Sequence, residues 1–190
     1  MKSHRFYQEI MNKFLITYSI FFLSIVAAGE ISVSISENLV NEYLRIIGNH
    51  EIPKGKKGNQ ALWSIKNPYV IFEHGSAEFH STITFKREKI NIKKNIKKNI
   101  FVEYSYDDNQ IRMMIEDPVV KMERGGEIYG KVDLSAFYQQ GLQFQGPKPK
   151  NQSIKFNTNK GKIKVNMNLK KSIIYFEKGV VRVAIDLKYK

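Results

Sequence analysis

The histidines and carboxylates of this sequence are the residues that could carry chemistry, and several of them stand close together. Glu78 and His80 are two residues apart, and His74 lies shortly before them. Residues two apart in a strand share one face, so strands supply such pairs without any site being formed. A metal site needs three or four converging ligands. We therefore expect no metal site here.

Asp107 and Asp108 form a second candidate pair. The run Asp-Asp-Asn-Gln is typical of a turn, whereas catalytic carboxylates of glycosidases must face each other across a cleft. Sequence signatures of nucleophile elbows, phosphate-binding loops, zinc peptidases and dinucleotide folds do not occur. The chain has no cysteine, which excludes disulfides and thiolate chemistry. The sequence thus predicts a non-enzymatic protein without a cofactor; a hydrolase that depends on His80 or Asp107 is the alternative.

Basic residues dominate the charge, with a formal net charge of +13. The densest basic run is KREKINIKKNIKKNI, which contains Lys86, Arg87, Lys89, Lys93, Lys94, Lys97 and Lys98. We interpret this run as a patch for anionic lipid headgroups, since cations near a membrane surface each contribute about 1 kcal/mol. A solvated hairpin tip is the alternative, because charge runs usually face water.

The N-terminal residues differ in composition from the rest. A basic leader precedes the uncharged run FLITYSIFFLSIVAA, and Val26 and Ala28 stand where a signal peptidase requires small residues. The apolar run is shorter than the roughly 20 residues of a membrane span. Residues 1–28 are therefore predicted to be a signal peptide, with an uncleaved anchor as the alternative. Residues 29–190 would be periplasmic or otherwise outside the cytoplasmic membrane, where nucleic acid is not an expected partner.

Residues 29–190 are predicted to form a single domain that begins with a strand and a helix. Either Ser34, which has the capping-box spacing to Glu37, or Ser36 would begin the helix. Gly48 would end it. The helix presents a broad apolar face at helical spacing, made by Leu39, Tyr43, Ile46 and Ile47.

Alternation of apolar and polar residues predicts strands in most of the remaining chain. The expected strands cover residues 62–72, 77–85, 100–106, 111–115, 154–157, 163–169, 173–176 and 180–189. Residues 49–60 are expected to be a loop. A second short helix is predicted from Leu134 to Gln140, capped by Asp133.

One hairpin pattern occurs three times, as Phe72-Glu73-His74-Gly75, Met122-Glu123-Arg124-Gly125 and Phe176-Glu177-Lys178-Gly179. The first and last copies align with their flanks at an offset of 104 residues, from Gly75 to Gly179. The central copy carries an extra Gly126, which reverses the alternation unless a β-bulge absorbs it. Internal duplication and repeated use of one favourable turn are both open; either predicts long antiparallel hairpins.

The order of these elements resembles the YceB-like family of bacterial envelope lipoproteins, which is related to the tubular lipid-binding superfamily. The resemblance covers residues 31–189 and rests on Ser-Glu-x-x-x-Asn-x-Tyr-Leu from Ser36 onward and on the apolar-Glu-x-Gly hairpins. It implies an α+β fold, with a long, strongly curved antiparallel sheet wrapped around one main N-terminal helix. The family's lipid-bearing cysteine is missing here, which implies a form without an acyl tether.

The resemblance implies a protein that binds a lipid or another apolar ligand in an elongated groove, where burial of hydrocarbon alone drives binding. The expected lining consists of Leu39, Tyr43, Ile47, Trp63, Phe72, Phe79, Met113, Ile115 and Phe176. The alternative is a structural or protein-interaction module of the envelope, with a filled core and a basic surface patch, because most apolar faces simply pack.

Overall fold

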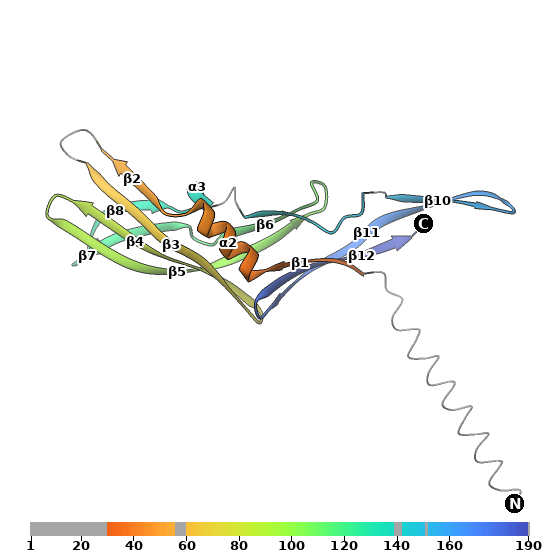
Figure 1. Cartoon of the computed structure of the whole chain (residues 1–190), viewed down its shortest axis with the longest axis horizontal. Helices are drawn as coiled ribbons and strands as arrows, with labels where there is room; N and C mark the ends of the chain where they lie inside the picture. The colour runs from red at the N-terminus through yellow and green to blue at the C-terminus, as the bar shows by residue number, and fades with distance from the viewer. Residues whose placement is uncertain (1–29, 56–59, 139–141, 151, 190) are drawn as a thin grey trace, which may run out of the picture. The chain divides into compact units, whose positions relative to one another are not determined.

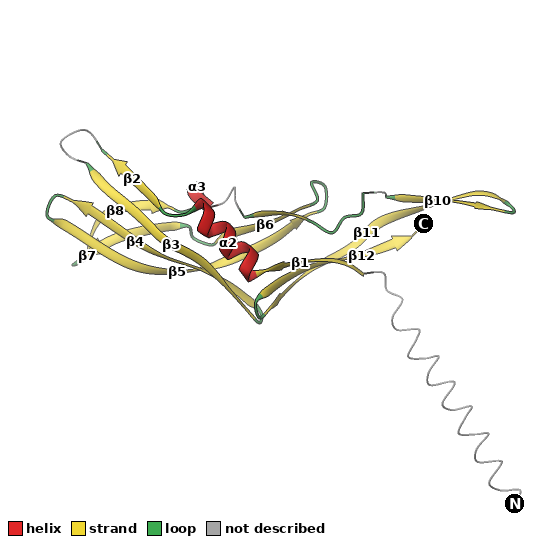
Figure 2. Cartoon of the chain, in the orientation of Figure 1, coloured by secondary structure: helices red, strands yellow, loops and turns green. Residues whose placement is uncertain are grey.

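The computed structural model of the chain describes residues 30–55, 60–138, 142–150 and 152–189. The predicted signal peptide, residues 1–28, lies outside the described residues. The chain divides between Glu30 and Ile31, and the features below belong to the unit Ile31–Lys190. Strands make up most of its described part, with two short helical segments (Figures 1 and 2).

The three repeated patterns each form the turn of an antiparallel hairpin, as predicted. They join β3 (Ala61–Glu73) to β4 (Ser76–Arg87), β7 (Val119–Arg124) to β8 (Glu127–Asp133), and β11 (Gly161–Glu177) to β12 (Val180–Tyr189). In the central hairpin the pairing moves from Met122–Gly130 to Glu123–Ile128. A bulge at Tyr129 therefore absorbs the extra residue, so that the strand keeps its alternation on both sides.

A six-stranded sheet has the order β2-β3-β4-β5-β6-β9. Its further members are β2 (His50–Lys54), β5 (Ile90–Ser105), β6 (Gln110–Ile115) and β9 (Gln143–Gln145). β2 lies in the segment predicted as a loop; it pairs with β3, and its Ile52 packs against the core. Most of the basic run belongs to β5, whose isoleucines occupy even positions and so share one face.

A four-stranded sheet has the order β1-β12-β11-β10, where β1 is Glu30–Ser36 and β10 is Ser153–Thr158. β7 and β8 form a separate two-stranded sheet. The second predicted helix is the single turn α3 (Ser135–Tyr138). Asp133 precedes this turn and caps it: its Oδ1 accepts hydrogen bonds from the N–H and the hydroxyl of Ser135 at 2.9 and 2.7 Å. The predicted end of this helix, at Gln140, lies outside the described residues.

The first and last copies of the repeated turn contact each other. The N–H of Gly75 donates to the carbonyl of Phe176 at 3.1 Å, and the N–H of Gly179 donates to the carbonyl of Phe72 at 2.9 Å. The contact is reciprocal, since both copies use the same two positions. Both glycines have positive φ, which a residue with a Cβ rarely adopts. The repeat thus joins the six-stranded sheet to the four-stranded sheet.

The helix α2 (Glu37–Ile47) closes part of the edge of β3. Its N-cap is Ser36, whose Oγ accepts from the N–H of Leu39 at 3.2 Å. The side chain of Asn41 accepts from the N–H of Val70 at 2.7 Å and donates to its carbonyl at 3.0 Å. These bonds replace those of a neighbouring strand, so this stretch of backbone is not left unpaired.

The predicted α+β fold, with a sheet wrapped around the N-terminal helix, is wrong. The protein is mostly β, with two sheets curled into half-barrels and two short helices (Figure 2). α2 has 11 residues, and its buried residues are Val40 and Leu44.

Strands cover one another instead of the helix. Phe79 and Ile83 of β4 belong to the same buried cluster as Met113 of β6 and Val181 and Val183 of β12. Strand periodicity identifies an apolar face but not the element that covers it, so the central role of the helix rested on the family resemblance.

Candidate functional site

The strand geometry distributes the predicted anionic-surface patch over two faces. Directly paired residues of antiparallel strands point to the same side. Lys93 pairs with Thr84 and Lys97 pairs with His80, on the side away from the core. Lys86 also lies on this face, which we call the outer face of β2–β5. Three of the seven predicted residues are thus brought together.

The other members of the patch are not on the outer face. Lys94 pairs with Ile83 and Lys98 with Phe79, at positions in register with the core residues of β4. Both lysines line a pocket together with Asp117 and Glu123, so acidic residues share that surface. Arg87 alternates with Lys86 and belongs to the same side as Lys94, while Lys89 lies in the turn between β4 and β5.

The predicted apolar lining separates into three groups. Trp63, Phe72, Phe79, Met113 and Ile115 are buried together in the core. Ile47 and Phe176 are half-buried and pack against that core. Leu39 and Tyr43 are exposed on α2. The structure therefore brings seven of the nine residues into or against one core; ligand binding by them stays a prediction.

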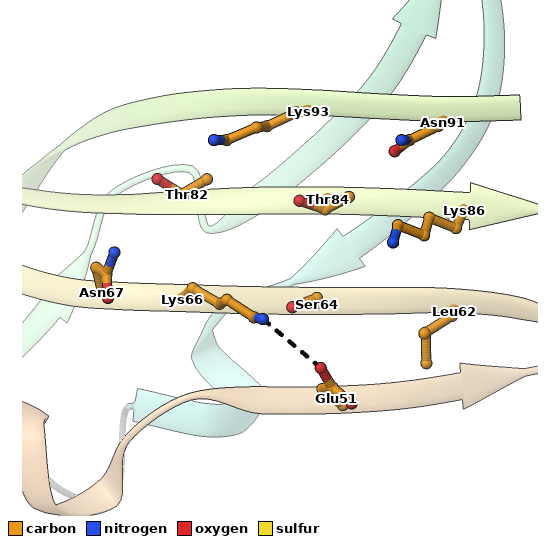
Figure 3. Close-up of a pocket in the computed structure, with 10 residues that line it drawn as sticks. All are labelled: Glu51, Leu62, Ser64, Lys66, Asn67, Thr82, Thr84, Lys86, Asn91 and Lys93. Atoms are coloured by element: carbon orange, nitrogen blue, oxygen red, sulfur yellow. Dashed lines mark ion pairs between the residues drawn. The ribbon is translucent and has the colours of Figure 1, made fainter.

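The outer face carries a pocket of about 390 Å³, which we call the outer-face pocket (Figure 3). This volume lies within the range of small-molecule sites, about 300–1,000 Å³. All but one of its ten lining side chains carry a polar group; they are Glu51, Leu62, Ser64, Lys66, Asn67, Thr82, Thr84, Lys86, Asn91 and Lys93. Its chemistry is therefore polar and mainly cationic.

Strand register explains why these side chains converge. Ser64 pairs with Glu51 on one side and with Thr84 on the other, and Thr84 pairs with Lys93. One row thus crosses four strands, with neighbouring Cβ atoms about 5 Å apart. Lys66 and Lys86 lie in the two adjacent rows, roughly 7 Å away along the strands. Three lysine side chains can therefore reach the two central hydroxyl groups.

Ser64 lies at the floor of the outer-face pocket and is only 8% exposed. Its Oγ is buried and has no hydrogen-bond partner. A buried hydroxyl left unpaired costs about 1–3 kcal/mol, so such groups are rare in folded proteins. Ser81, by contrast, donates its hydroxyl to the carbonyl of Lys66 at 2.9 Å. The surrounding side chains cover the Oγ of Ser64, so a ligand oxygen could bond to it only where those side chains move aside.

Positive charge in the outer-face pocket is only partly compensated. The Nζ of Lys66 lies 3.8 Å from the carboxylate of Glu51, an exposed pair of the kind that contributes little to stability (Figure 3). Lys86 and Lys93 form no ion pair within the described part of the chain. An anionic group entering the pocket would meet three lysines and one carboxylate.

Beside the outer-face pocket, the charged side chains of the outer face are paired with one another. Lys97 donates to Glu78 at 2.7 Å, and the Nε2 of His80 lies 3.2 Å from the same carboxylate. The His80 ring stacks on Tyr69, with 4.9 Å between centroids. The hydrogen bond from Lys97 lowers the pKa of Glu78. Lys97 is thus already paired, unlike Lys86 and Lys93.

The sequence candidates for chemistry are placed as follows. Glu78 and His80 share the outer face, whereas His74 lies in the β3–β4 turn. Asp108 stands in the β5–β6 turn, where its carboxylate accepts from Ser105 and Arg112, so the prediction of a turn is confirmed. Among the described residues, no group of three or more His, Asp or Glu side chains could hold a metal ion.

A third pocket, of about 540 Å³, opens beside the aromatic end of the core and is called the core-end pocket. Trp63 and Phe85 contribute aromatic rings, and Gly130 lies against Trp63 so closely that a Cβ would come within 2.6 Å of the ring. The basic residues of its wall are Lys54, Arg87 and Lys131. It combines an apolar floor with a cationic rim.

Comparison of the chain with protein-family models, curated proteins and solved structures gives no match. Function must therefore be argued from the described residues themselves. Of the helices in the described ranges, none has the length and apolar character needed to cross a membrane.

Sequence reasoning missed the centre of the outer-face pocket. Ser64, Lys66, Thr82 and Thr84 stand outside the predicted site residues. The signal was the alternation itself, because polar side chains occupy positions 64 and 66 and positions 82, 84 and 86. Each such series defines one strand face, but only the pairing of β3 with β4 makes the two series adjacent.

Proposed function

We propose that this protein is a non-enzymatic binding protein that holds a small anionic, hydroxyl-bearing ligand in the outer-face pocket. The observation that carries the proposal is the buried, unpartnered Oγ of Ser64 at the floor of a pocket walled by three lysines. A phosphate ester or a carboxylate would neutralise the ammonium groups. Neighbouring hydroxyls of a sugar or polyol would bond to the amides, the threonines and Glu51.

Binding is a better account of this pocket than catalysis. A serine nucleophile needs a base within hydrogen-bond reach, and Ser64 is joined to no such group in the described structure. With the export predicted from residues 1–28, the ligand would be met outside the cytoplasm. Phosphorylated or uronic sugars of envelope polymers and phosphate-bearing lipid headgroups share the required chemistry.

Isothermal titration calorimetry with the full chain tests the proposal. Glucose 6-phosphate and glucuronate are expected to bind, and glucose is not. Lys93→Gln should weaken binding at least about tenfold, since a charge-assisted hydrogen bond is worth about 1.5–3 kcal/mol. Lys97→Gln is the matched control, because Lys97 lies on the same strand and face but is paired with Glu78. Equal effects of the two substitutions, or no binding of either anion, would refute the proposal.

The source of the ligand can be resolved in the same experiment. Vesicles that contain a phosphoinositide offer the same phosphate and hydroxyl groups on a lipid. Competition between these vesicles and glucose 6-phosphate would assign both to one pocket. Binding of the vesicles without competition would assign lipid recognition to another surface.

The core-end pocket favours a second candidate function, the binding of an apolar ligand predicted from the sequence. An acyl chain could contact Trp63 and Phe85 while its anionic end meets the basic rim. Trp63 is the single tryptophan of the chain, so its fluorescence reports directly on this pocket. A fatty acid should change that fluorescence, and organic extraction should yield co-purified lipid. No change and no lipid would exclude this candidate.

A further inference from the structure

The hairpin of β10 and the start of β11, residues 153–166, exposes an apolar face. The register pairs Phe156 with Ile163 and Ile154 with Val165, which places these four side chains on one side. Phe156 is 48% exposed and Ile163 50% exposed. We call this element the amphipathic hairpin. Adjacent exposed apolar side chains mark an interaction surface more often than single ones do.

No described protein segment covers this face. In the described chain β10 pairs with β11 alone, at the edge of the four-stranded sheet (Figure 1). Ile154, Phe156 and Ile163 belong to neither of the hydrophobic clusters formed by the described residues. The apolar face is thus separate from the core, and packing of the core does not account for these exposed apolar side chains.

The opposite face of the amphipathic hairpin is basic. Lys155 pairs directly with Lys164, and Lys162 follows on the same side. Like charges directly opposite one another destabilise a strand pair, and neither lysine has an ion-pair partner in the described ranges. The surrounding residues 134–176 contain eight lysines and no Asp or Glu. The hairpin therefore lacks its own counter-charge.

We propose that the amphipathic hairpin binds in the interface of an anionic lipid bilayer. Its apolar face would lie among the upper acyl chains, while Lys155, Lys162 and Lys164 stay at the level of the headgroup phosphates. The charge argues for lipid over a second copy of this chain, because a second copy carries the same formal net charge of +13 and supplies no counter-charge for these lysines, whereas an anionic bilayer does. The proposal uses residues distinct from the outer-face pocket and stands or falls independently of it.

Co-flotation of the full chain with vesicles tests this inference. Vesicles of phosphatidylcholine with phosphatidylglycerol should bind the protein, and added salt should weaken binding. Vesicles of phosphatidylcholine alone should bind it much less. Phe156→Ser should reduce binding at least tenfold. Phe101→Ser is the matched control, since Phe101 is equally exposed, at 49%, on β5.

The basic face is tested by Lys162→Gln with Lys164→Gln, which should reduce binding about fivefold for each charge removed. Lys121→Gln with Lys178→Gln removes two exposed charges outside both the hairpin and the outer-face pocket and should leave vesicle binding unchanged. If Lys86→Gln with Lys93→Gln loses binding and the hairpin double variant does not, the membrane contact lies on the outer face and the inference is wrong.

Depth of insertion gives a readout that misfolding cannot imitate. Phe156→Trp should show emission shifted to the blue and quenching by brominated lipids. Wild-type protein, with Trp63 buried in the core, is the control for background quenching. Absence of quenching of the new tryptophan overturns the proposal. So does a dimer in lipid-free solution that Phe156→Ser converts to a monomer, because the apolar face would then serve self-association.

Discussion

The outer-face pocket lies on a lysine-rich antiparallel sheet, and the amphipathic hairpin is a second lysine-rich antiparallel element. Each has one apolar face, but the two differ in what covers that face. In β3–β5 the apolar side chains belong to the core, and the opposite, polar face carries the outer-face pocket with the buried, unpaired hydroxyl of Ser64. In the hairpin the apolar side chains are themselves exposed. We thus propose that the same two-residue alternation yields a site for a small anion in one region and a surface for lipid in the other.

The largest expected effect is on the free energy of unfolding when one aromatic residue in each region is replaced. Phe79→Asp places an unpaired carboxylate in the core, where Phe79 is fully buried, and should cost more than about 4 kcal/mol. Phe156→Asp should change the free energy of unfolding by about 0.5 kcal/mol or less, because Phe156 is exposed. Urea denaturation followed by circular dichroism measures both. Similar losses in both variants would mean that the hairpin belongs to the folded core.

A smaller effect is expected where α2 closes the edge of β3, in contrast to the open edge of β10. Asn41→Ala removes both side-chain hydrogen bonds to the backbone of Val70 and should destabilise the protein by about 1–3 kcal/mol. Asn38→Ala is the control on the same helix, since Asn38 is exposed. Equal stability of the two variants would show that the helix does not protect this edge.

The smallest effect concerns pH and the paired part of the outer face. Because Lys97 lowers the pKa of Glu78 in the folded state, the Glu78 carboxylate stabilises the fold above its unfolded pKa, about 4.3. That stabilisation is lost as pH falls through the lower folded value. Glu78→Gln should therefore flatten the acid limb of the plot of Tm against pH. Glu73→Gln, which changes an exposed residue at the end of β3, should leave it intact; the reverse result would contradict the assignment.

Local structure followed from the sequence more closely than the fold did. The helix with its Ser36 cap, the three hairpin turns and the need for a bulge beside Gly126 all depend on near neighbours. The segments that cover each apolar face lie far away in the sequence. The predicted position of α2 at the centre of the fold is therefore wrong. The basic run shows the same limit, because alternation in β5 sends Lys93 and Lys94 to opposite faces.

The outer-face pocket could be predicted only in part. Strand alternation assigns Ser64, Lys66, Thr82, Thr84 and Lys86 to polar faces from the sequence alone. The burial of Ser64 depends on side chains from β2 and β4 whose register no local pattern fixes. The unpartnered hydroxyl arises only when β2, β3 and β4 pair in the folded protein. The sequence alone therefore does not identify the residue on which the proposed function rests.

Ser64→Ala tests the central claim most directly, because stability and binding should change in different directions. Removing an unpaired buried hydroxyl should leave the free energy of unfolding unchanged or raise it by up to about 1 kcal/mol. The same change should weaken glucose 6-phosphate binding by at least about tenfold, as expected for a lost hydrogen bond to a charged group. Calorimetric titration and urea unfolding of the same preparation give both values. Unchanged affinity, or a clear loss of stability, would contradict a ligand-binding role for Ser64.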